Sequence, residues 1–161
     1  MSYKSNELQQ RAILALQHIV NKKDLRPVFR AVWTHRSRAV ATDSHLIISI
    51  RLKDESLNFF SGCNSLNANK QIVYTDPSGF DQTWSNLTRV IDNIDSMKKS
   101  ESVHINYKLM NNIFKTLKLL KYAPTHNKIV IETFEEKIVV TAENDDYIIT
   151  AHCMCLSVYR I

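Results

Sequence analysis

Two segments of the chain carry apolar residues at helical spacing. In residues 6–21 these residues recur at steps of three and four after a capping residue, Ser5 or Asn6, which predicts an amphipathic helix. Residues 106–121 show the same spacing before Pro124 and predict a second helix. The apolar residues are Leu8, Ala12, Ala15, Leu16 and Ile19 in the first segment, and Leu109, Met110, Ile113, Phe114, Leu117 and Leu120 in the second.

Apolar runs of strand length follow each predicted helix. They cover residues 27–34, 38–42 and 46–52 after the first helix, and residues 128–134, 137–142, 147–151 and 153–159 after the second. Both blocks share one order: a strand, a tight polar turn, a strand that ends in Thr or Ala before an acidic residue, and another strand. The pattern therefore predicts a helix-plus-strands unit that is used twice, over about residues 5–52 and 102–161.

The polar segment between the two units, residues 53–101, gives a weaker signal. It holds both glycines of the chain, and two short strands are expected in it, near residues 57–60 and 71–74. We interpret this segment as a long irregular excursion. With 161 residues, of which 44% are hydrophobic, the chain is long enough for one α+β domain over residues 1–161.

Charge is distributed unevenly, although the formal net charge is only +5. Residues 8–52 hold eight basic and two acidic residues, residues 102–131 hold five lysines and no acid, and the last thirty residues hold six acids. The polar sides of the two predicted helices carry amides and cations, with Glu7 as their one carboxylate. A basic side and an acidic side are expected, which suits a polyanionic partner. The alternative is an ordinary solvated surface on which the charges cluster by chance.

The sequence argues against several classes of function. It has no run of about 18 apolar residues and no signal-peptide core near its start, so we expect a soluble, cytoplasmic protein without a membrane partner. Three cysteines without a CxxC pair indicate reduced thiols, and Cys153 and Cys155 would face a core together. The six histidines lack metal-site spacing, and two glycines leave no phosphate-binding loop. We expect no metal, no cofactor and no catalysis, although Asp43 and His45 could imitate an acid-base pair.

Two short motifs resemble a known family. Arg26-Pro27-Val28, followed by Ala41-Thr42-Asp43-Ser44-His45-Leu46, resembles the R-P-V-L and A-T-D-G-H-R-L signatures of bacterial β-type sliding clamps, the processivity rings of DNA polymerase. The two predicted helices are similar to clamp helices, and residues 156–161 match the register of a clamp's terminal apolar-M-P-apolar-R-L. Residues 79–91 are similar to the F-P-D-Y-x-R-V-I-P connector without its prolines. The departures are Ser44 in place of glycine, Leu46 in place of arginine, and Ser157-Val158 in place of Met-Pro.

The resemblance implies a DNA-clamp-like domain of two pseudo-repeated units, with the helices on one face of curved antiparallel sheets. Helix cations and amides would reach the phosphates of duplex DNA without reading bases. The residues expected to contact DNA are Gln10, Arg11, Gln17, Lys22, Lys23, Lys108, Asn111, Asn112, Lys115 and Lys118. The arginines on predicted strands or turns, for which ion pairs with the acidic block or between subunits are expected, are Arg26, Arg30, Arg36 and Arg38.

The resemblance also implies a pocket for short peptide motifs of DNA polymerases and other replisome proteins. The residues at the corresponding positions are Thr42, Ser44, His45, Leu46, Arg89, Val90, Ser157 and Val158. A bacterial clamp protomer has three such domains, so this chain would need several copies, head to tail, to encircle DNA, and six would match a bacterial ring. Short single-domain clamps of this kind are typical of phages and mobile elements.

The function expected on this basis is that of a non-catalytic accessory protein of DNA replication or repair, acting as a homo-oligomer. An alternative keeps the fold without the ring. In that alternative the protein is a regulator or decoy that binds replisome proteins or clamp-binding peptides and does not encircle DNA.

Overall fold

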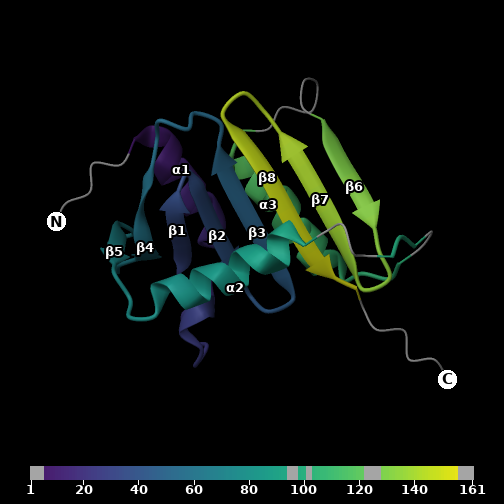
Figure 1. The fold of residues 1–161 in the computed structure, drawn as a ribbon, viewed down its shortest axis with the longest axis horizontal. Coiled ribbons are helices and arrows are strands. Elements are labelled where there is room, and N and C mark those ends of the chain that lie inside the picture. Colours follow the sequence, from purple (N-terminus) through teal and green to yellow (C-terminus); the bar gives the residue numbers. More distant parts are fainter. Residues whose placement is uncertain (1–5, 94–97, 101–102, 122–127, 156–161) are drawn as a thin grey trace.

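An eight-stranded antiparallel sheet is the centre of the structure, a computed structural model that describes residues 6–93, 98–100, 103–121 and 128–155 (Figure 1). Its strands are β1 (Val32–Arg36), β2 (Arg38–Thr42), β3 (Leu46–Leu52), β4 (Phe59–Leu66), β5 (Ile72–Thr75), β6 (Ile129–Thr133), β7 (Lys137–Glu143) and β8 (Tyr147–Met154). Their order across the sheet is β5-β4-β1-β2-β3-β8-β7-β6. Strands from the two ends of the chain therefore meet at β3 and β8, which pair from Leu46 opposite Cys153 to Leu52 opposite Tyr147.

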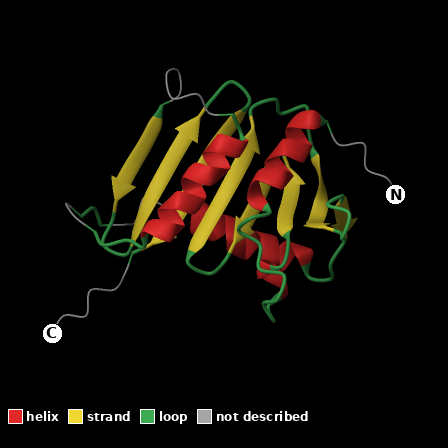
Figure 2. Cartoon of the chain, turned by 180° about the vertical axis from the view of Figure 1, so that it is seen from behind, coloured by secondary structure: helices red, strands yellow, loops and turns green. Residues whose placement is uncertain are grey.

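Helices lie on both faces of this sheet. Figure 2 shows α1 (Glu7–Leu16) and α3 (Tyr107–Leu119) side by side on one face, and the two helices contact each other. The third helix, α2 (Phe80–Asp92), crosses the opposite face, in front of the sheet in Figure 1. A short 3-10 helix, η1 (Pro27–Phe29), precedes β1. Within the described residues, no helix combines the length and the apolar character needed to cross a membrane.

Alternation along the strands divides the buried residues into two cores. On β8, Tyr147, Ile149, Ala151 and Cys153 belong to the larger core beneath α1 and α3, and so the residues between them face the α2 side. Each fully buried aliphatic side chain in such a core contributes about 1.5–3 kcal/mol. The smaller core beneath α2 consists of Ala31, Trp33, Val40, Ile47, Cys63, Phe80, Leu87 and Ile91.

Side-chain caps fix the starts of α1 and α3. The Asn6 side chain accepts from the backbone N–H of Leu8 at 3.0 Å, and the Gln9 side chain accepts from the backbone N–H of Asn6 at 2.9 Å. At α3, the side chain of Asn106 accepts from the N–H of Lys108 at 2.9 Å. Both helices thus begin where the sequence predicts, because amide side chains satisfy backbone N–H groups that lack a helical partner.

The α+β class is confirmed, and β2 and β3 have the predicted bounds. Other boundaries differ. The run 27–34 begins as η1, because Pro27 fixes φ for a turn and lacks an N–H for a strand ladder. The helix predicted over 6–21 ends at Leu16, and Phe114, predicted to be in the apolar stripe of α3, is exposed. The run 147–151 and the first two residues of the run 153–159 form one strand, β8, because His152 continues the alternation, and residues 156–159 of that run lie outside the described residues.

The two short strands expected near residues 57–60 and 71–74 are present as β4 and β5, with different bounds. The interpretation of the rest of residues 53–101 as irregular is wrong, because the segment also contains α2, which carries Phe80, Trp84, Leu87 and Ile91 at the helical spacing i, i+4, i+7 and i+11. The prediction that the helices share one face is therefore right for α1 and α3 and does not extend to α2.

The two glycines of this segment have separate structural reasons. Gly62 lies within β4, where an added Cβ would be 2.5 Å from the carbonyl oxygen of Thr75 and 2.6 Å from the ring of Tyr74. Gly79 is the N-cap of α2 with a φ of 75°, in the left-handed region that glycine adopts without a steric penalty. Glycine therefore marks a close strand approach at one position and a helix start at the other.

Candidate functional site

A rigid turn between β2 and β3 carries the residues that the clamp-like motif singles out. The carboxylate of Asp43 accepts from the backbone N–H groups of His45 at 3.0 Å and Leu46 at 2.8 Å, and the Thr42 hydroxyl accepts from the N–H of Ser44 at 3.2 Å. Ser44 has a φ of 81°, a conformation for which glycine is the usual residue. The Asp43 carboxylate therefore stabilises this turn through bonds to the backbone. These bonds do not orient the carboxylate towards the ring of His45.

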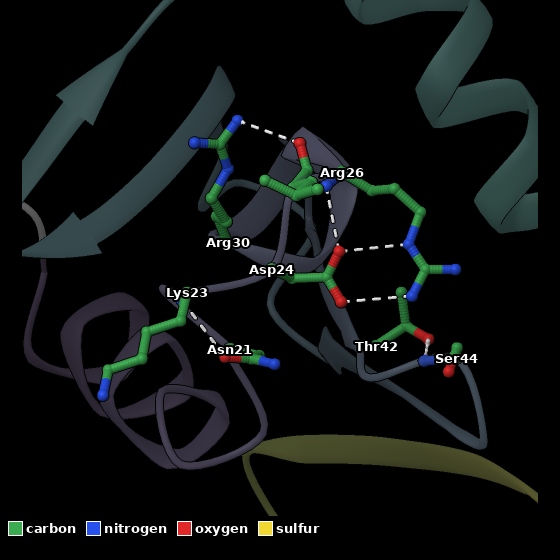
Figure 3. Close-up of polar contacts among 8 residues, drawn as sticks. Asn21, Lys23, Asp24, Arg26, Arg30, Thr42 and Ser44 are labelled. Carbon is green, nitrogen blue, oxygen red and sulfur yellow. Dashed lines mark hydrogen bonds and ion pairs between the residues drawn. The ribbon is translucent and has the colours of Figure 1, made fainter.

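The segment before β1 lies beside this turn and forms one wall of a pocket described below. The backbone N–H of Asn21 donates to the carbonyl of Phe29 at 2.8 Å, and Asp24 pairs with Arg26 at 3.0 Å (Figure 3). The guanidinium of Arg26 also stacks 4.1 Å above the Phe29 ring, and hydrogen bonding to Arg26 lowers the pKa of the half-buried Asp24 carboxyl. These contacts hold Val28 and Phe29 at the side of the turn.

Two of the strand and turn arginines make ion pairs with acids other than those expected. Arg26 pairs with Asp24, and Arg38 pairs with Asp92 of α2 at 3.1 Å. Neither acid belongs to the acidic last thirty residues, so these pairs correct the expected pairing with that block. The Arg38 pair links the sheet to α2 and thereby helps to position the helix over the pocket.

The floor of the pocket contains a basic pair from β7 and β8. The Lys137 ammonium lies 2.9 Å from Nδ1 of His152, and the His152 side chain is buried, with 3% of the residue exposed. Burial, reinforced by the charge of Lys137, lowers the pKa of His152 to about 4, and burial also lowers the pKa of Lys137. At neutral pH, His152 is therefore uncharged and accepts a hydrogen bond from Lys137.

These elements enclose a cavity of about 500 Å³ on the α2 face of the sheet. This volume lies within the range typical of small-ligand and peptide pockets. The lining residues are Val28, Phe29, Thr42, Ser44, His45, Leu46, Ile47, Thr83, Asn86, Leu87, Val90, Lys137, His152 and Met154. The walls are mostly apolar and the floor is basic, an arrangement that can bind apolar side chains together with an anionic group.

Five of the eight predicted peptide-binding residues line this cavity, namely Thr42, Ser44, His45, Leu46 and Val90. Arg89 lies on α2 with an exposed side chain and is not among the lining residues, and Ser157 and Val158 lie outside the described residues. Sequence reasoning missed the other lining residues, which belong to η1, β3, α2, β7 and β8. The helical spacing of Leu87 within residues 80–91 was an available signal, whereas nothing local indicated that Lys137 and His152 would meet.

Comparison with family models, curated proteins and solved structures finds no match for this chain. The functional argument therefore depends on the geometry of this molecule. The part of the chain that the structure describes holds no cluster of His, Cys, Asp and Glu suited to a metal ion. Cys153 belongs to the larger core and Cys155 packs against it, so both face the interior as the strand pattern predicts, and burial raises the pKa of each thiol.

The opposite face of the sheet presents α1 and α3 in antiparallel orientation. His18, just after α1, donates from Nε2 to the Asn112 carbonyl in the middle of α3 at 3.1 Å, while Leu119 at the end of α3 lies beside Gln10 and Leu14 of α1. The two helices together contain Glu7 as their one acid, and its carboxylate pairs with Arg11. This face is therefore rich in cations and amides.

The ten predicted DNA-contacting residues fall into two groups on this face. Seven have exposed side chains, namely Gln10, Lys22, Lys23, Lys108, Asn111, Lys115 and Lys118. The other three are half-buried, and these three and Lys22 make contacts within the protein. Arg11 pairs with Glu7, Gln17 donates to the Asn64 carbonyl at 3.2 Å, Lys22 donates to the Leu66 carbonyl at 2.7 Å, and Asn112 is half-buried between the helices. The exposed cations are thus concentrated on α3.

Proposed function

We propose that this protein is a non-catalytic, DNA-clamp-like accessory protein of replication or repair. It holds duplex DNA against α1 and α3 and binds short peptide segments of replisome proteins in the pocket on the opposite face. The observation that carries the proposal is the pair of antiparallel helices, nearly free of carboxylates, on one face of a sheet that continues through both halves of the chain.

The topology supports two pseudo-repeated units. One half of the chain runs α1-β1-β2-β3 and the other runs α3-β6-β7-β8, and the last strand of each half pairs with the other. In each half the three strands form a meander, and its helix lies on the same face of the sheet. Two copies of one unit related by a local two-fold axis would have this arrangement.

The charge of α3 supports contact with a polyanion. Lys108, Lys115 and Lys118 are exposed, and the first and the last are ten positions apart, which corresponds to about 15 Å of helix. If each lysine neutralises one phosphate, the three contribute about −2.7 to the slope of log affinity against log salt concentration. Contacts of this strength bind the DNA backbone without reading sequence and still permit sliding.

The ends of the sheet support assembly from several copies. β5 and β6 are its terminal strands, and β6 exposes Ile129 and Ile131, at 41% and 49%. A terminal strand offers unpaired backbone groups that a strand of another copy can join, although at the end of β6 the carbonyl of Thr133 already accepts from the N–H of Ser100. A head-to-tail oligomer built in this way would extend the sheet and keep every α1–α3 pair on the same side.

The DNA proposal can be tested by removing the α3 lysines. In the variant with Lys108, Lys115 and Lys118 changed to Gln, we expect the salt slope of duplex binding to fall by about 2.7 and the affinity to fall with it. The matched control changes Lys70, Lys98 and Lys99 to Gln, which removes the same charge elsewhere. Fluorescence anisotropy with a labelled duplex measures both variants. Equal weakening by the two sets would overturn the assignment of α1 and α3 as the DNA-contacting face.

One observation favours a second function, in which the protein regulates or imitates a clamp without encircling DNA. The pocket is lined by residues of one chain, and three of the predicted DNA contacts, Arg11, Gln17 and Lys22, bond to other groups of that chain. Light scattering after size-exclusion chromatography separates the two functions. A monomer at high concentration that binds a purified clamp and not DNA supports the regulator, and an oligomer that binds DNA supports the clamp.

A further inference from the structure

We infer that the pocket recognises a peptide segment in which an acidic side chain lies among apolar side chains, and that Lys137, held by His152, binds the carboxylate. This inference rests on the proposed function, in which the pocket binds peptides. It adds the chemical class of the ligand and names the residue that selects it.

Lys137 is a half-buried cation without an ion pair among the described residues. By contrast, Lys53, Lys98 and Lys99 each pair with a glutamate on a neighbouring strand or loop. The charge of Glu136 raises the pKa of Lys137 against the larger effect of burial, yet Glu136 makes no ion pair with Lys137. An ammonium that is partly removed from water and lacks a counter-charge is a favourable site for an anion.

His152 holds the Lys137 ammonium in a defined position. Its ring is buried at the pocket floor, and Nδ1 accepts from Lys137 at 2.9 Å, which fixes the ammonium in the cavity. The other ring nitrogen, Nε2, is buried and has no hydrogen-bond partner within bonding geometry. The backbone of Ile91 and the charge of Asp92 act in the direction of a higher His152 pKa, but burial and Lys137 outweigh them. A carboxylate that enters the cavity would supply the missing counter-charge to this basic pair.

The rest of the cavity accounts for the apolar part of the ligand. Phe29, Ile47, Leu87, Val90 and Met154 surround the basic floor, and Val90 and Met154 remain 47% and 48% exposed. Because apolar walls surround a single cation, a ligand gains most when apolar side chains flank one anionic group. A cationic peptide would place a like charge beside Lys137.

Because Lys137 and His152 lie at the floor of the pocket, an acidic side chain is favoured over a terminal carboxylate as their ligand. His152 is 3% exposed at the floor, whereas the apolar rim is open to solvent. A Glu or Asp side chain extends away from its backbone, so it can reach the floor while the peptide backbone stays at the rim. A terminal carboxylate could reach the floor only if the end of the peptide chain itself entered the cavity.

A peptide library tests the inference. Acetylated and amidated octapeptides with Leu, Val, Phe or Met at the variable positions carry Glu, Gln or Lys at one central position, and binding to the full chain is measured by fluorescence anisotropy. We expect the best Glu peptide to bind at least about tenfold more tightly than its Gln counterpart. In Lys137→Met this preference should fall below about twofold with the affinity for the Gln peptide retained, and Lys137→Arg should restore it. The control Lys98→Met, on an exposed surface, should behave as the wild type.

The outcomes separate this inference from the proposed function. If the wild type binds Glu and Gln peptides equally well, recognition of the carboxylate is overturned, but the proposal that the pocket binds peptides is retained. This comparison requires no variant. Tight binding of a Gln peptide with a free C-terminus would assign the floor to a terminal carboxylate and overturn the side-chain assignment. Absence of any binding up to about 1 mM would overturn both the inference and peptide capture, while the DNA part of the proposal is tested separately by the α3 lysines.

Discussion

The buried ring of His152 should make the stability of this protein depend on pH in a defined window. Its pKa in the folded protein is about 4, whereas an unperturbed histidine has a pKa of 6.5. Between these values the unfolded chain binds a proton at this residue that the folded chain does not bind. The free energy of unfolding therefore falls as the pH falls from above 6.5 towards 4.

The size of this effect follows from the two pKa values. A difference of one in pKa corresponds to about 1.4 kcal/mol, so proton uptake by the unfolded state costs about 2 kcal/mol of stability by pH 5 and about 3 kcal/mol by pH 4. The physical causes are burial of the ring and the Lys137 ammonium beside it, which outweigh the opposite effect of Asp92. Such a loss is a large part of the stability of an ordinary domain.

Urea unfolding followed by circular dichroism at pH 7, 6 and 5 measures this loss in the wild type and in His152→Asn. The Asn side chain keeps an acceptor for Lys137 and does not titrate, so we expect the variant to lose about 2 kcal/mol less than the wild type between pH 7 and pH 5. The matched control is His45→Asn, which makes the same substitution on the exposed turn between β2 and β3. The same dependence in His152→Asn and in the wild type would refute the reasoning.

Three further predictions concern the fold, and urea unfolding at pH 7 measures each. Gly62→Ala should destabilise the protein by about 1–3 kcal/mol, because the new Cβ would meet the Thr75 carbonyl at 2.5 Å, and full stability in this variant would contradict the close approach of β4 and β5. Ser44→Gly should stabilise it by up to about 1 kcal/mol, since serine is strained at a φ of 81°; destabilisation would contradict that conformation. Ile149→Ala, fully buried on β8, should cost about 2–5 kcal/mol, and a cost below about 1 kcal/mol would argue against its place in the core.

The elements that sequence reasoning predicted well are those with strong local signals. β2 and β3 are short runs rich in apolar residues that polar residues separate, and the starts of α1 and α3 carry Asn6 and Asn106 as caps, so their positions follow from short-range chemistry. The helix α2 was missed although its four apolar residues have helical spacing, because polar residues separate them and Gly79 indicated a loop. In the structure, Gly79 is instead the residue at which this helix begins.

The candidate pocket was predictable only on the side that a local motif forms. Thr42 to Leu46 make their own turn, so the motif placed them together correctly. Lys137 and His152 are fifteen residues apart and meet because β7 pairs with β8 in a register that sets Val139 opposite His152. That register, and the pairing of β8 with β3, depend on long-range packing that no short stretch of sequence encodes.

The pocket and the α1–α3 face lie on opposite sides of the same strands. The fold therefore separates the two candidate binding surfaces. On β3, Ile48 faces the core beneath α1 and α3 whereas Ile47 faces the core beneath α2, and on β8, Cys153 and His152 divide in the same way. A ligand in the pocket and a polyanion on the helices would therefore lie on opposite sides of one sheet without touching each other. Under the proposed function, Lys137→Met should alter peptide selection with DNA binding intact, and loss of the α3 lysines should do the reverse. An accessory protein that holds DNA while it binds replisome proteins requires this separation.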